Sequence, residues 1–86
     1  MFNINAFQNH LTEIEPMIVA LSNPRNGFLE IKGMTSLLPN KAQAYITKDG
    51  RLRCFSFSGS EAKEFAEGSE RYAALWTRNK ISRGEK

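Results

Sequence analysis

Residues 42–58, AQAYITKDGRLRCFSFS, decide the fold predicted for this chain. Asp49-Gly50 lies between two runs of alternating residues, and this pair favours the type I′ turn of a two-residue β-hairpin because both turn positions take positive φ. The turn would set Lys48 opposite Arg51. One face of the hairpin would then carry Ala42, Ala44, Ile46, Lys48, Arg51, Arg53, Phe55 and Phe57, and the other Gln43, Tyr45, Thr47, Leu52, Cys54 and Ser56.

An apolar stripe lies before the hairpin. Its members recur every three or four positions, the spacing of one helix face, and they are Ile4, Phe7, Leu11, Ile14, Ile18 and Leu21. Pro16 falls inside the stripe and removes a helical hydrogen bond. Because the stripe keeps its spacing across Pro16, we expect a kinked helix or two abutting helices. The alternative makes residues 17–21 a strand and residues 22–27 a turn.

The segment 23–27, NPRNG, interrupts regular structure. Residues 28–32 then alternate, with Leu29 and Ile31 on one face, which predicts a first strand. Residues 33–41 are expected to form a loop.

A second helix is predicted from Ser58 or Ser60, since Ser58 with Glu61 fits a capping box. Gly68-Ser69 would kink or split it. Its apolar face would consist of Ala62, Phe65, Ala66, Tyr72, Ala73 and Trp76. Residues 79–86 are expected to fray as a basic tail.

The sequence therefore predicts one α+β domain over residues 1–86. Its elements would follow the order α-β-β-β-α, with a three-stranded antiparallel sheet and both helices packed on one face. At 86 residues a second domain is not expected.

Cysteine content and charge indicate the compartment and the class of partner. Cys54 is the single cysteine, so no intrachain disulfide can form, and the first twenty residues lack the basic and apolar regions of a signal peptide. The longest apolar run, residues 17–21, is too short to cross a membrane. We expect a cytoplasmic protein. The net charge of +3 is concentrated in the middle and at the tail, which permits an anionic partner.

Catalytic and metal-binding patterns are weak. Cys54, His10 and Glu13 could form a nucleophilic site only if the thiol met the imidazole, and nothing in the sequence places them together. Glu61, Glu64 and Glu67 lack the His or Cys that zinc requires and the loop that calcium requires. We expect no enzyme activity, no metal and no cofactor.

The function predicted is therefore docking on a macromolecule, as a small adaptor, inhibitor or regulatory subunit. The protein-contact candidates are Phe28, Tyr45, Leu52 and Trp76. The alternative is a nucleic-acid-binding module whose candidates are Lys48, Arg51, Arg53, Phe55, Arg78, Lys80 and Arg83. The order of these two hypotheses depends on whether Phe55 and Phe57 are core, which we expect, or an exposed stacking platform. The chain would be a monomer or a homodimer.

Overall fold

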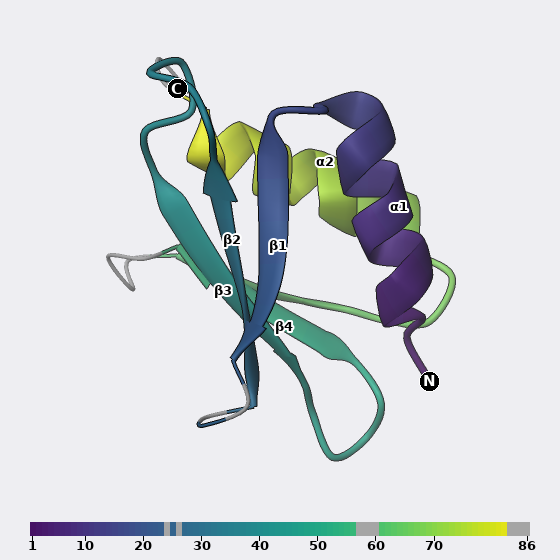
Figure 1. The fold of residues 1–86 in the computed structure, drawn as a ribbon. Helices are drawn as coiled ribbons and strands as arrows, with labels where there is room; N and C mark the ends of the chain where they lie inside the picture. The colour runs from purple at the N-terminus through teal and green to yellow at the C-terminus, as the bar shows by residue number, and fades with distance from the viewer. Residues whose placement is uncertain (24, 26, 57–60, 83–86) are drawn as a thin grey trace.

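The computed structural model describes residues 1–23, 25, 27–56 and 61–82. It is an α+β fold in which two helices pack on a five-stranded antiparallel sheet (Figure 1). The elements are α1 (Ile4–Ile14), β1 (Ile18–Asn23), β2 (Phe28–Gly33), β3 (Lys41–Ile46), β4 (Leu52–Ser56), β5 (Ala62–Phe65) and α2 (Glu70–Ile81). The strands pair in chain order as a meander, β1-β2-β3-β4-β5. The predicted three-stranded sheet and α-β-β-β-α order were therefore wrong, and two segments expected to be helical are strands.

The first correction concerns the residues after Pro16. Helix α1 ends at Ile14, and Glu15 adopts an extended conformation with φ −147° and ψ 95°. A residue before proline is excluded from the helical region by the proline ring, so Pro16 ends the helix and does not merely kink it. Residues 18–23 then pair with β2, with Ile18 opposite Gly33 and Asn23 opposite Phe28. The structure bears out the alternative in making this segment a strand, although β1 runs on to Asn23, into the segment that the alternative made a turn.

The second correction concerns the register of the β3–β4 hairpin. Ala44 lies opposite Cys54, and Tyr45 lies opposite Arg53, one position away from the predicted pairing. Thr47 and Arg51 close the turn through Thr47 N–H donating to the Arg51 carbonyl at 2.8 Å. Only Gly50 in this turn has positive φ, +85°, which fits a three-residue loop ending in a left-handed glycine and not a type I′ turn.

A register shift of one residue reverses the faces of β4. Leu52 and Cys54, predicted on the face opposite Ala42 and Ala44, share their face and are fully buried. Phe55, predicted as core, lies on the other side of the sheet and is half-buried. Phe57 lies outside the described residues.

The third correction concerns the start of the last helix. Residues 62–65 form β5, paired with β4 through Arg53 opposite Glu64 and Leu52 opposite Phe65. Gly68 has φ +94°, and α2 begins after Ser69. The predicted capping residues Ser58 and Ser60 lie outside the described residues. The helix continues to Ile81, whose side chain is fully buried, so the helix does not fray at residue 79.

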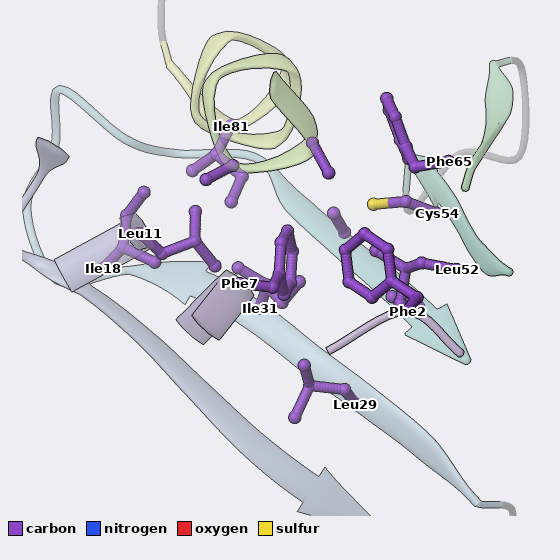
Figure 2. Packing of buried hydrophobic residues seen from close by; sticks show 14 of the residues in the cluster. Phe2, Phe7, Leu11, Ile18, Leu29, Ile31, Leu52, Cys54, Phe65 and Ile81 are labelled. Atoms are coloured by element: carbon purple, nitrogen blue, oxygen red, sulfur yellow. The ribbon is translucent and has the colours of Figure 1, made fainter. Parts of the chain in front are cut away.

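The core lies between the helices and the inner face of the sheet. Figure 2 shows Phe7 and Leu11 of α1 and Ile81 of α2 directed into one buried cluster, to which Ile31 and Leu52 of the sheet also belong. Small residues, Ala42 and Ala44 on β3 and Ala73 and Ala74 on α2, complete the buried cluster. Among the described residues, no helix is long and apolar enough to cross a membrane.

Candidate interaction surface

The outer face of the sheet, turned away from the helices, gathers three aromatic side chains. Strand alternation brings Phe28 from β2, Tyr45 from β3 and Phe55 from β4 to this face, and all three are half-buried. Inner-face neighbours such as Leu29, Ala44 and Cys54 carry the core instead. We call Phe28, Tyr45 and Phe55 the outer aromatic patch.

The rings of the patch contact one another. Phe28 and Tyr45 are stacked, with centroids 5.1 Å apart and planes 11° apart. Phe55 meets both rings edge-on, at 5.8 Å from Phe28 and 6.4 Å from Tyr45. Because each of the two stacked rings covers a face of the other, the patch is a compact apolar surface and not a set of separate platforms.

Charged side chains surround the patch on the same face. Arg53, directly opposite Tyr45, lies with its Nη1 3.5 Å from the Glu64 carboxylate. Lys32 on β2 and Lys41 on β3 are directly opposite each other and exposed. This pair therefore brings two positive charges together at one side of the face. A cavity of about 110 Å³ lies among Glu30, Lys32, Lys41 and Gln43.

Most of the remaining nucleic-acid candidates are placed apart from this face. Arg51 and Lys48 lie at the tip of the β3–β4 hairpin, and Arg51 Nε is 3.6 Å from the Asp49 carboxylate. Lys80 on α2 forms a 2.6 Å ion pair with Glu61, and its Nζ lies 5.5 Å from the centroid of the Trp76 ring. Arg78, also on α2, is half-buried, and Arg83 lies outside the described residues.

Two protein-contact candidates do not belong to the patch. Leu52 is a fully buried core residue on the inner face. Trp76 is partly buried on α2, where it packs edge-on against Phe65 with centroids 5.7 Å apart. The structure therefore brings together Phe28, Tyr45 and Phe55, which the sequence had divided between two hypotheses.

The residues considered for catalysis have different hydrogen-bond and ion-pair partners. Cys54 is buried beneath α2, where burial raises the pKa of its thiol to about 11. His10 lies on α1, with its Nδ1 3.5 Å from the Glu13 carboxylate. Within the described part of the chain, no group of three or more His, Cys, Asp or Glu residues is arranged to hold a metal ion.

Some residues of this face were missed from the sequence. Val19 and Leu21 of β1 join it beside Lys32 and Glu30, and Leu21 is 53% exposed. The alternation of Phe28, Glu30 and Lys32 marked the polar side of β2, but only the pairing of β1 with β2 extends that face to the edge of the sheet.

No protein-family model, curated protein or solved structure matches this chain.

Proposed function

We propose that this chain is a non-enzymatic protein-binding domain that docks a partner protein on its outer aromatic patch. The observation that carries the proposal is the convergence of Phe28, Tyr45 and Phe55 from three strands on the sheet face that bears no helix among the described residues. Aromatic side chains are enriched in protein interfaces and supply much of their binding energy. Acting as an adaptor, inhibitor or regulatory subunit, the domain would work by contact and not by chemistry.

Charge beside the patch indicates the chemistry of the partner. Lys32 and Lys41 are directly opposite each other at one side of the face, and Arg53 lies 3.5 Å from the Glu64 carboxylate. A partner surface with an apolar centre and an acidic group facing the two lysines would complement this arrangement. Such complementarity raises the association rate and fixes the orientation of docking.

Nucleic-acid binding is supported less well by the same geometry. Single-strand binding uses aromatic ring faces on which bases stack, but Phe28 and Tyr45 stack on each other. Phosphate binding uses accessible cations, and three of the cations predicted for this role, Arg51, Arg53 and Lys80, each lie within 4 Å of a carboxylate oxygen, that of Asp49, Glu64 and Glu61 respectively.

Site-specific photo-crosslinking tests the proposal. A photoreactive phenylalanine analogue replaces Gln43 on the outer face, or Thr12 on the exposed side of α1 as the control, in the cells that make the protein. We expect the Gln43 position to give a product that contains a second, different protein and the Thr12 position to give none. The product should be lost on adding Tyr45→Ala and reduced on adding Lys32→Glu with Lys41→Glu.

Two results would contradict the proposal. One is the same products from Gln43 and Thr12, or none from Gln43. The other is crosslinking of Gln43 to nucleic acid, accompanied by binding of single-stranded DNA or RNA that weakens steeply between about 50 mM and about 200 mM salt. The second result would favour the nucleic-acid module instead.

A further inference from the structure

Strand β1 forms an open edge of the sheet. Its residues pair with β2 on one side, and the strand order of the described residues places no strand on the other. An edge strand presents a row of backbone N–H and C=O groups that can pair with another strand.

The ladder shows which backbone groups point outward. Met34 N–H donates to the Met17 carbonyl at 2.7 Å, so the backbone of Met17 is turned towards β2. Because this orientation alternates along an antiparallel strand, Val19 and Leu21 also turn towards β2, and Ala20 and Ser22 turn towards the open edge. No backbone hydrogen bond joins Ala20 or Ser22 to a turn or loop in the described part of the chain.

The two edges of the sheet differ in their protection. Strand β5 has four residues, and two of them, Lys63 and Glu64, are charged. Strand β1 has six residues, IVALSN, with neither a charge nor a proline. Short length and charged side chains are the usual devices that keep an edge from pairing, and β1 carries neither.

We infer that β1 pairs with β1 of a second copy of this chain, antiparallel about a twofold axis at Ala20. In this register each Ala20 N–H donates to the Ala20 carbonyl of the other copy. Each Ser22 N–H donates to the Ile18 carbonyl of the other copy. The Ile18 N–H takes no part in the pairing, because it already donates to the Glu15 carbonyl of its own chain at 3.1 Å. The alternation of outward groups excludes a register shifted by one residue.

Side chains of β1 suit pairing with themselves. On the outer face the same register sets Val19 of one copy opposite Leu21 of the other, so that the 53% exposed Leu21 gains an apolar neighbour. No charged side chain of the strand meets its own copy, since β1 has none. The two outer faces would then form one continuous surface with an aromatic patch on each half.

A single strand pair buries less area than a standard protein interface. The inferred dimer is therefore weak, with a dissociation constant in the micromolar range and not the nanomolar range. Isologous twofold pairing closes on itself and produces a dimer without further growth.

Sedimentation equilibrium of the purified chain, from about 1 µM to about 1 mM, tests this inference. We expect the mass to rise from one chain to two across this range. Leu21→Lys should raise the dissociation constant at least tenfold, because it replaces the apolar contact with Val19 of the second copy, which occurs twice in the dimer, by a charged side chain. Leu37→Lys, a change at a 68% exposed leucine outside the strands, is the matched control and should leave the constant unchanged.

Ala20→Pro removes the central outward N–H and should also give monomers, provided that near-ultraviolet circular dichroism shows a native fold. Leu21→Lys changes only an exposed side chain, so its result decides the question if Ala20→Pro does not fold. A wild-type chain that stays monomeric throughout overturns the inference. A dimer that Leu21→Lys and Leu37→Lys weaken equally, or that neither weakens, also overturns it.

Discussion

The thiol sulfur of Cys54 lies 3.3 Å from the hydroxyl oxygen of Thr77, and the two groups share a hydrogen bond in the core. Both side chains are fully buried, and the contact joins β4 to α2. Burial raises the pKa of the Cys54 thiol to about 11, although the hydrogen bond with Thr77 acts in the opposite direction. The contact requires Cys54 to face the helices.

Thiol labelling is expected to report this placement. The thiolate is the reactive form, and a raised pKa with full burial leaves very little of it accessible at neutral pH. In native protein Cys54 should therefore react with an aromatic disulfide reagent orders of magnitude more slowly than in denaturant. Rapid labelling of folded protein would place Cys54 on the outer face and restore the register that the sequence predicted.

Truncation of Leu52 is expected to be costly. Its side chain is 0% exposed between the sheet and the helices, whereas that of Leu37 is 68% exposed. Leu52→Ala should lower the free energy of unfolding by about 2–5 kcal/mol, and Leu37→Ala by about 0.5 kcal/mol or less. Urea denaturation of the two variants measures both values. Equal costs would contradict the burial of Leu52.

Replacement of glycine by alanine should lower the free energy of unfolding more at Gly33 than at Gly27. A Cβ on Gly33 would overlap the Leu38 side chain and lie 2.6 Å from the Leu38 carbonyl oxygen. Gly27 has φ +73° with open space around it, so Gly27→Ala carries backbone strain alone, about 1 kcal/mol. Gly33→Ala should cost about 3 kcal/mol because backbone must move. Thermal and urea unfolding measure the difference, and a cheaper Gly33→Ala would contradict it.

Acid is expected to weaken a contact between the first residues and α2. Asn3 N–H donates to the Glu70 carboxylate at 2.9 Å, and this bond is the main reason that the pKa of Glu70 lies below its usual value. A lowered folded-state pKa adds stability above the unfolded value, about pH 4.5, and that stability is lost as the pH falls through the folded pKa. Wild type should thus be more stable than Glu70→Gln at pH 7, with the difference shrinking below about pH 4.5. Denaturation curves across this range measure it, and a constant difference would contradict it.

Much of the fold was accessible from local patterns. The α1 stripe through Ile14 and the strand at residues 28–32 were predicted from periodicity, and a hairpin whose turn contains Asp49-Gly50 was expected and is present, although its register differs. The predicted continuation of this helix past Pro16 was wrong. Ile18 and Leu21 match a helical spacing by coincidence, whereas Pro16 keeps Glu15 extended.

The predicted site was wrong because the predicted register of the β3–β4 hairpin was wrong by one residue. Asp-Gly is compatible with either a two-residue or a three-residue turn, and a difference of one residue moves Phe55 from the core to the outer face. Residues 62–65, AKEF, have helix-forming composition, but pairing with β4 overrides it. Neither the turn length nor this pairing can be read from one segment alone, since both depend on contacts with the rest of the sheet.

The bond between Asn3 and Glu70 spans 67 positions of the chain, whereas every strand of the meander pairs with its neighbour in sequence. Hairpin pairing is local and fast, but docking α1 against α2 must close a long loop. During synthesis the sheet can thus begin to assemble on the ribosome, while Phe7 and Leu11 lack their α2 neighbours until residues 70–81 have left the exit tunnel. A nascent chain halted before that point would present its apolar interior to chaperones.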